Sequence, residues 1–139
     1  MLVQTWNPDA DAVARVPEHD YDGFAEHELA WREALAWPPF SRLVAVRIEG
    51  EDPGETAAVA RKLGDRVAVL LPGPATGVRL LGPAPAPLPR LRGKSRWQLL
   101  LKAPRHALLG PVLDQLERDV EVLPGAVRVV FDVDPGAML

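Results

Sequence analysis

The residues best suited to chemistry in this sequence are cations, and they are concentrated in its middle. Residues 66–113 contain eight Arg or Lys and no Asp or Glu, so this stretch carries a charge of +8. The residues before it carry −7 and those after it carry −4, although the net charge of the chain is only −3. Because a positive region concentrates anions around it, the pattern predicts binding of a nucleic-acid backbone or an acidic peptide.

Residues 94–102 alternate in the way of a β-strand, which would collect part of this charge on one face. The face turned toward a core would hold Ser95, Trp97, Leu99 and Leu101. The opposite face would hold Lys94, Arg96, Gln98, Leu100 and Lys102. We predict that the second face contacts an anionic partner, whereas the alternative is an ordinary solvated strand face.

The candidate binding residues follow from this strand and its surroundings. They are Lys94, Arg96, Gln98, Arg90, Arg92 and Lys102, with Trp97 and Arg79 as weaker candidates. An aromatic ring within a basic strand can stack on the bases of a single strand. The residues that share a face with Trp97 are leucines, so we expect this ring to pack in the core instead.

A proline-rich arm leads into the strand, with Pro at 83, 85, 87 and 89. Each proline fixes φ and disfavours the α region for the residue before it, so we expect a polyproline-like arm or a rigid loop. A central strand is excluded because proline cannot donate to a ladder. The segment Pro87-Leu88-Pro89-Arg90 also resembles a ligand of proline-reading domains, which leaves an interaction scaffold without nucleic-acid binding as the alternative function.

The remaining pattern predicts three helices, further strands and a detached N-terminal segment. Strands are predicted over residues 2–6, 42–49, 76–81, 94–102 and 127–133, and helices over residues 20–36 and 52–71, with a third helix that carries Leu109, Leu113, Leu116 and Val120. Asp20 or Asp22 can cap the first helix, and Asp52 followed by Pro53 starts the second. The third helix would begin at Gly110-Pro111 or have a broken first turn, because a proline inside a helix removes a hydrogen bond.

From residue 42 onward the predicted order is β-α-β-β-α-β. Two split βαβ units of this kind form an α+β fold, a four-stranded antiparallel sheet with both helices on one face. We divide the chain into residues 1–19, a remnant strand and linker; residues 20–41, a helix and a Pro-Pro turn; and residues 42–139, the split βαβ domain. The second face of the sheet would remain open to a partner.

Composition narrows the function classes. The chain has no cysteine, which excludes disulfides and thiolate metal sites and fits a reducing compartment. No apolar run approaches the length of a membrane span and no signal peptide is visible, so we expect a cytoplasmic protein without membrane contact.

Catalytic and metal-binding interpretations are weak. The three histidines, His19, His27 and His106, are scattered, and no nucleophile context accompanies them. Asp132 and Asp134 share one strand face and could hold Mg²⁺, although we favour a solvated strand end or contact with nearby arginines. We therefore predict no metal site and no catalytic residue.

Several segments, in their order and spacing, resemble the C-terminal domain of the bacterial replication-restart helicases of the PriA family, also called primosomal protein N-prime. The resembling segments are Val3-Gln4-Thr5-Trp6-Asn7-Pro8, Asp20-Tyr21 with Phe24, Glu28-Leu29 and Arg32, Pro38-Pro39-Phe40, residues 81–87, Arg96-Trp97-Gln98, and Asp132-Val133-Asp134-Pro135. The resemblance covers nearly all of the chain.

The resemblance implies a module that helps a fork-remodelling motor to hold branched or single-stranded DNA. It also implies a contact with the acidic C-terminal tail of single-stranded DNA-binding protein, together with other primosome proteins. By position, the pocket for that tail would include Lys94 and Gln98. A lysine there keeps the charge but lacks the bidentate geometry that arginine offers to a carboxylate.

The chain lacks the parts of the family that perform catalysis. It has no Gly-x-x-x-x-Gly-Lys-Ser/Thr loop to hold ATP phosphates, and it has none of the zinc-binding cysteines of the family. Both would lie upstream of this stretch in a longer protein. We therefore expect a non-enzymatic module without a cofactor of its own, within a family whose full-length members are ATP-dependent 3′–5′ DNA helicases.

Overall fold

The computed structural model describes residues 4–71, 73–123 and 125–135, and the chain divides into two compact units, Met1–Trp37 and Pro38–Leu139. The first unit contains α1 (Asp11–Ala14) and α2 (Tyr21–Ala34). The elements of the second are β1 (Arg42–Gly50), α3 (Pro53–Leu70), η1 (Pro74–Thr76), β2 (Arg79–Leu91), β3 (Lys94–Ala103), η2 (His106–Leu108), α4 (Gly110–Glu121) and β4 (Val127–Val133).

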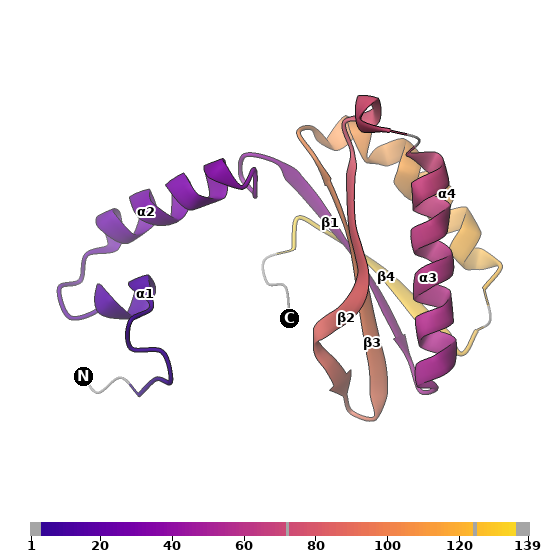
Figure 1. The fold of residues 1–139 in the computed structure, drawn as a ribbon, viewed down its shortest axis with the longest axis horizontal. Coiled ribbons are helices and arrows are strands. Elements are labelled where there is room, and N and C mark those ends of the chain that lie inside the picture. Colours follow the sequence, from indigo (N-terminus) through magenta and orange to yellow (C-terminus); the bar gives the residue numbers. More distant parts are fainter. Residues whose placement is uncertain (1–3, 72, 124, 136–139) are drawn as a thin grey trace. The chain divides into compact units, whose positions relative to one another are not determined.

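The second unit has the predicted α+β architecture. Its four strands form one sheet in the order β2-β3-β1-β4, and every neighbouring pair is antiparallel. Figure 1 shows α3 and α4 together on one side of this sheet. The β-α-β-β-α-β prediction is therefore confirmed.

The core lies between the sheet and these two helices. Alternate residues of β1 point into it, namely Val44, Val46 and Ile48, all almost fully buried. Leu99 and Leu101 of β3 meet them from the neighbouring strand. This is the alternation expected of a strand with one face on a core, so the predicted apolar face of β3 is correct.

Helix α3 begins where its sequence predicts. The Asp52 carboxylate accepts a hydrogen bond from the Glu55 backbone N–H at 2.6 Å, and Pro53 stands in the first turn, where its missing N–H costs nothing. Ala60, Leu63 and Val67 form the buried stripe on the core. The cap and the stripe together fix both the start and the rotation of the helix.

Helix α4 begins at Gly110, after the short helix η2. Pro111 thus lies in the first turn of α4 rather than in its interior. Of the two predicted alternatives, the start at Gly110-Pro111 is therefore the one observed. Val112 and Leu116 are buried against the core, and Leu113 and Val120 pack at its margin.

The proline arm is a strand, which corrects the prediction of a loop between two strands. Strand β2 starts at Arg79 rather than at residue 76 and continues through all four prolines to Leu91. It lies at the edge of the sheet, where proline is tolerated because one side of the strand needs no ladder donor. Its pairing with β3 shifts register between Leu81 and Ala84 and again between Pro85 and Arg90, so each shift leaves extra residues on β2.

The first unit has little apolar burial. Helix α2 is capped by Asp20, whose carboxylate accepts from the Gly23 backbone N–H at 3.0 Å, and the predicted pair of Arg32 with Glu28 is present at 2.7 Å. Neither α1 nor α2 contains a buried residue. The predicted strand over residues 2–6 falls partly outside the described residues, and residues 4–6 form no strand.

Candidate nucleic-acid interface

The predicted binding residues meet most closely at the hairpin that joins β2 to β3. Leu91 lies opposite Lys94, so only Arg92 and Gly93 form the turn. Both have positive φ, at 50° and 80°, which is the geometry of the type I′ turns that match the twist of a β-hairpin. Gly93 adopts this conformation without strain, and a side chain placed there would meet open space.

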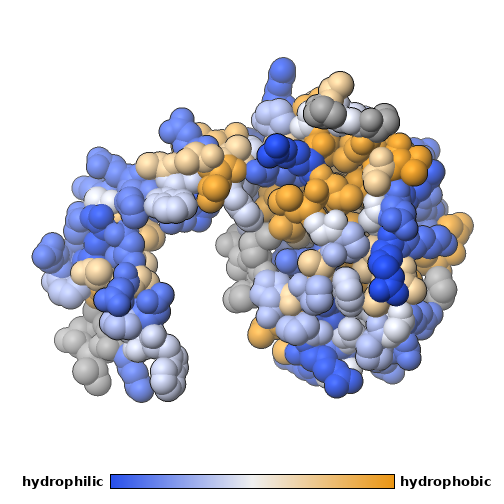
Figure 2. Space-filling model, viewed as in Figure 1, coloured by the Kyte–Doolittle hydropathy of each residue, from blue (hydrophilic) through white to orange (hydrophobic). Residues whose placement is uncertain are grey.

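Three cationic side chains surround this turn. Arg90, Arg92 and Lys94 are all exposed, and no ion pair joins any of them to another residue in the part of the chain that the structure describes. In Figure 2, hydrophilic side chains cover the lower end of the second unit, residues 38–139, and hydrophobic side chains gather over its upper part. We define Arg90, Arg92 and Lys94 as the hairpin cations.

Arg96 does not have the exposure predicted for it. Arg96 is only 8% exposed, and its Nε donates a hydrogen bond to Oε1 of Glu49, on the neighbouring strand β1, at 2.8 Å. The two residues are direct cross-strand partners, so their side chains lie on the same face. The acid-free middle of the sequence therefore acquires an acid from a strand 47 residues away, which the local charge pattern did not reveal.

The centre of β3 contributes less free charge than the sequence suggested. Trp97 is half-buried and packs against the core, as expected, and Gln98 is half-buried on the opposite face, between Arg47 and Ala84 of the adjoining strands. The core position of the ring makes it part of the packing of the sheet.

Arg79 and Lys102 form a second cationic group at the far end of the β2–β3 pair. They are cross-strand partners, with Arg79 exposed and Lys102 half-buried. Lys102 lies eight positions after Lys94, so the two groups lie roughly 26 Å apart along the strand. The eight candidate residues thus form two cationic ends with a neutralised centre, rather than one continuous strip.

An acid-rich hollow of about 530 Å³ lies beside Lys94. Its charged lining consists of Glu49, Glu51, Asp52, Glu55, Lys94 and Arg128. The carboxylates outnumber the cations there, and they oppose the approach of an anion from this side. An anion would therefore meet Arg90 and Arg92 more favourably than Lys94.

Asp132 and Asp134 contact arginines, which is one of the two arrangements predicted in preference to a Mg²⁺ site. Arg47 lies 2.6 Å from Asp132, and Arg42 lies 3.2 Å from Asp134. Asp134 also accepts from the Leu43 backbone N–H at 3.1 Å, so it ties the end of β4 to the start of β1. Among the described residues, no group of three or more His, Asp or Glu could hold a metal ion.

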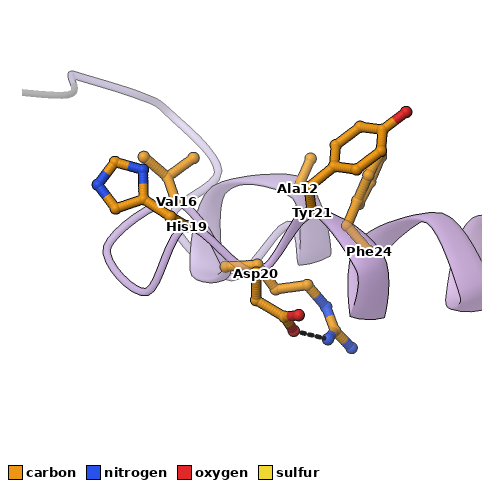
Figure 3. A pocket seen from close by; sticks show the side chains of 7 residues that line it. Ala12, Val16, His19, Asp20, Tyr21 and Phe24 are labelled. Atoms are coloured by element: carbon orange, nitrogen blue, oxygen red, sulfur yellow. Dashed lines mark hydrogen bonds and ion pairs between the residues drawn. The ribbon is translucent and has the colours of Figure 1, made fainter.

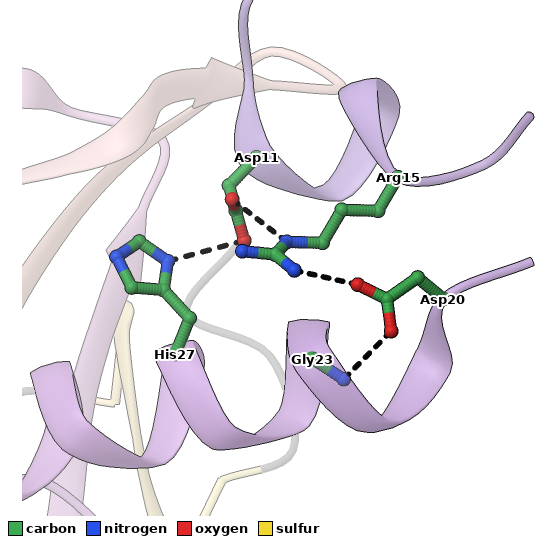
Figure 4. Close-up of polar contacts among 5 residues, drawn as sticks. All are labelled: Asp11, Arg15, Asp20, Gly23 and His27. Atoms are coloured by element: carbon green, nitrogen blue, oxygen red, sulfur yellow. Dashed lines mark hydrogen bonds and ion pairs between the residues drawn. The ribbon is translucent and has the colours of Figure 1, made fainter. Parts of the chain in front are cut away.

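The first unit contains a polar network that links its two helices (Figure 4). Arg15 bridges Asp11 at 2.9 Å and Asp20 at 2.6 Å, and His27 Nδ1 lies 3.1 Å from Asp11 Oδ2. The hydrogen bond from Arg15 lowers the pKa of Asp11 against the opposing effect of burial, and His27 acts in the same direction as Arg15. The pKa of Asp20 is lowered mainly by the Gly23 backbone N–H and then by Arg15.

A hollow of about 270 Å³ adjoins this network, and Figure 3 shows Tyr21 and Phe24 on one side of it and Val16 and His19 on the other. The only cation in its lining, Arg15, is already bridged by two carboxylates. This hollow therefore offers no free positive charge to an anion.

A third hollow, of about 380 Å³, lies between α3 and α4. Val69 and Val122 form its exposed apolar margin, and Arg66 crosses it to Asp119 at 2.7 Å. Its lining contains two acids and two bases, so it has no net charge for steering a ligand. No helix in the described parts of the chain combines the length and the apolar character that crossing a bilayer requires.

Comparison with protein-family models finds a match over most of the chain. The model of the primosomal protein N C-terminal domain matches residues 33–136, which include the whole sheet and both of the helices that cover it.

Similar curated proteins share one name, replication restart protein PriA. The protein from Treponema pallidum is 36% identical over 97% of this chain, that from Synechocystis sp. PCC 6803 is 35% identical over 97%, and that from Bacillus subtilis is 27% identical over 100%. The chain spans only 20%, 16% and 17% of the length of these three relatives, respectively.

Proposed function

Because the chain belongs to the family of the primosomal protein N C-terminal domain, we propose that it is a non-catalytic module of a replication-restart protein that binds DNA and partner proteins. The bound DNA would be branched or single-stranded. The module would work in the cytoplasm beside other primosome proteins, and it would need no cofactor.

The observation that carries this proposal is the set of hairpin cations. Three exposed positive side chains at one turn, without an ion pair among the described residues, can neutralise phosphates without first breaking an internal contact. Contacts of this kind supply most of the sequence-independent affinity of proteins for DNA. Within the trio, Arg90 and Arg92 would contribute most, because Lys94 borders the acid-rich hollow.

The other predicted binding residues take smaller parts in this proposal. Arg96 positions β3 against β1 through Glu49 and does not contact DNA directly. Arg79 and Lys102 would serve a second stretch of backbone, because their distance from the hairpin exceeds the spacing of a few neighbouring phosphates.

A second partner of the same module would be the acidic tail of single-stranded DNA-binding protein. Lys94 and Gln98 share the face of β3 that α3 and α4 do not cover, and Lys94 is exposed. Since Lys94 belongs to both proposed sites, the tail and DNA would compete for it.

ATP hydrolysis and DNA unwinding would belong to other parts of a longer protein, as would the zinc site of the family. This follows from the missing phosphate-binding loop and cysteines in the sequence. The module would hold the DNA on which such a motor acts.

The proline-rich segment supports the alternative of an interaction scaffold poorly. Proline-reading domains bind a polyproline helix that is free along its length, whereas this segment lies within β2, between the positions Pro85 and Arg90 that pair with β3. The hairpin cations give DNA binding the stronger physical basis.

A titration tests the proposal. Labelled forked DNA, single-stranded DNA and an acidic tail peptide are each titrated with the purified chain, with fluorescence anisotropy as the readout, at several salt concentrations. We expect DNA affinity to fall steeply with salt, and we expect the double variant Arg90→Ala with Arg92→Ala to lose about tenfold in affinity for every DNA.

The matched control is the double variant Arg61→Ala with Lys62→Ala, which removes the same two charges from exposed positions on α3. If both variants lose DNA affinity equally, net charge rather than the hairpin is responsible. If neither variant loses affinity, the chain does not hold DNA through this surface and the proposal is wrong.

A further inference from the structure

The hairpin exposes two leucines beside its cations. Leu88 is 47% exposed and Leu91 is 46% exposed, although the core of the same unit buries other leucines almost completely. Single exposed leucines are common on protein surfaces, so exposure alone carries no argument. Here the exposed leucines lie within the same turn and bulge as three cations without ion pairs among the described residues, and this combination suits a ligand that is both anionic and apolar.

Strand geometry places positive charge on both sides of Leu91. Leu91 is the cross-strand partner of Lys94, so these side chains share one face of the hairpin, while Arg90 pairs with Ser95 and lies on the other face. Arg92 occupies the turn itself, beside a glycine with open space around it. The leucine thus stands at the tip with cations before it, after it and across from it.

Leu88 lies in the bulge that the structure adds to β2. Four residues separate Pro85 from Arg90, whereas only Arg96 separates their partners Trp97 and Ser95 on β3. The bulge therefore pushes part of the proline segment outward, and Figure 1 shows β2 bending just before the hairpin. Proline restricts this backbone, so Leu88 is held outward without a large loss of entropy on binding.

Phosphates satisfy cations, but they cannot satisfy a leucine. In continuous duplex DNA the faces of the base pairs are covered by their neighbours, and only the groove edges are accessible. At the branch point of a fork the last base pair exposes one face, between two strands of phosphates. Apolar side chains can lie against such unstacked bases while basic residues hold the flanking backbone.

We propose that Leu91, supported by Leu88, packs against the last base pair at a DNA branch point and makes the hairpin select forks over unbranched DNA. This inference rests on the proposed function, because the hairpin cations must first hold the backbone. The cations supply affinity for any DNA, and the leucines supply the preference for a junction.

The test compares forked DNA with single-stranded DNA and unbranched duplex of equal length, using the full chain. In the double variant Leu88→Ser with Leu91→Ser we expect affinity for the fork to fall about fivefold, at the low end of the range for aromatic stacking, because a leucine contacts a base without a ring. Affinity for the two unbranched DNAs should change less than about twofold, and the slope of affinity against salt should stay constant, since no cation is removed.

A fluorescent 2-aminopurine in the last base pair of the fork reports the contact directly. We expect its emission to change when the unaltered chain binds and to stay constant with the Leu88→Ser, Leu91→Ser variant at saturating concentration. The matched control is Leu81→Ser, another leucine on β2 that is 43% exposed but lies at the opposite end of the strand. Since all three leucines are exposed, thermal melts should differ little among these proteins.

The outcomes separate this inference from the proposed function. If the Arg90→Ala, Arg92→Ala variant loses affinity for all DNAs while the leucine variant still prefers the fork, only the role of the leucines is overturned. An equal loss for forked and unbranched DNA in the leucine variant overturns it as well. If the arginine variant binds every DNA normally, the proposed function fails and this inference fails with it.

Discussion

Arg92 and Arg96 differ in their surroundings although they lie four residues apart in the same acid-free stretch. Arg92 is exposed at a turn with positive φ, whereas Arg96 is 8% exposed and hydrogen-bonded to Glu49. The carboxylate of Glu49 already neutralises the Arg96 guanidinium, and burial leaves little of that side chain accessible to a phosphate. A run of positively charged residues therefore identifies candidate binding residues. Acidic partners on other strands decide which of these side chains remain without an ion pair.

The same contrast separates the apolar residues of this region. The aromatic side chain of Trp97 packs on the core, and the aliphatic side chain of Leu91 stands nearly half-exposed among cations. The residue type usually associated with base stacking is thus the structural one. Three predictions test this division between the centre of β3 and its hairpin end, and a fourth concerns an ion pair between α3 and α4.

The largest effect is expected for Trp97→Ala. Removing a ring that packs against the core should lower the free energy of unfolding by about 3 kcal/mol, near the low end for such changes because the ring is only half-buried. Urea denaturation measures this loss. A variant with unchanged stability but lost DNA binding would show that the ring acts on DNA, which would reverse the assignment.

The next effect is expected for Arg96→Ala, at about 2 kcal/mol of unfolding free energy, because it leaves the partly buried Glu49 without its partner. The double variant Arg96→Met with Glu49→Leu should recover part of this loss, because neither charge is then left alone. Both proteins should keep their DNA affinity while folded. A stable Arg96→Ala protein that no longer binds DNA would contradict the structural role of this arginine.

A smaller effect, on binding alone, is expected for Arg92→Ala. DNA affinity should fall roughly threefold to tenfold at low salt, and the slope of log affinity against log salt should decrease by about 0.9, the value for one phosphate contact. Unfolding free energy should change by less than about 0.5 kcal/mol, since the residue is exposed. Lys94→Ala should lose less affinity than Arg92→Ala because the acid-rich hollow already weakens this position; the reverse order would mean that the hollow does not shape the site.

The smallest effect concerns the partly exposed ion pair of Arg66 with Asp119, which is intermediate between the buried, paired Arg96 and the exposed, unpaired Arg92. The hydrogen bond from Arg66 lowers the pKa of Asp119, with Gln115 acting in the same direction and burial opposing both. Because folding lowers the pKa of Asp119, its ionised carboxylate stabilises the fold at pH values above about 4, the ordinary pKa of an aspartate. This stabilisation disappears as the pH falls through the lowered pKa. Acid titration followed by NMR of the α3–α4 contact should therefore show loosening only below about pH 4, and Asp119→Asn should remove that dependence.

Local physical chemistry explains why most of the elements were predictable. The Asp52-Pro53 start of α3 and the position of Pro111 in α4 depend on hydrogen bonds within one turn, so neighbouring residues suffice to place them. The alternation of β3 likewise follows from the two-residue period of a strand, which identified its core face correctly.

The proline arm was mispredicted because its conformation depends on its neighbour. Proline restricts φ to values that a strand and a polyproline helix share, so the residues alone do not distinguish them. The decision came from β3, which offers pairing partners along one side and leaves β2 at the edge of the sheet.

The sequence alone determined the order of the elements, the apolar face of β3 and the excess of positive charge in the middle of the chain, because each depends on residues close together along the chain. Only the tertiary structure decided that Glu49 neutralises Arg96 and that a tight turn gathers Arg90, Arg92 and Lys94 around Leu91. Both outcomes depend on which strands pair and in which register, and that pairing is set by packing over the whole sheet.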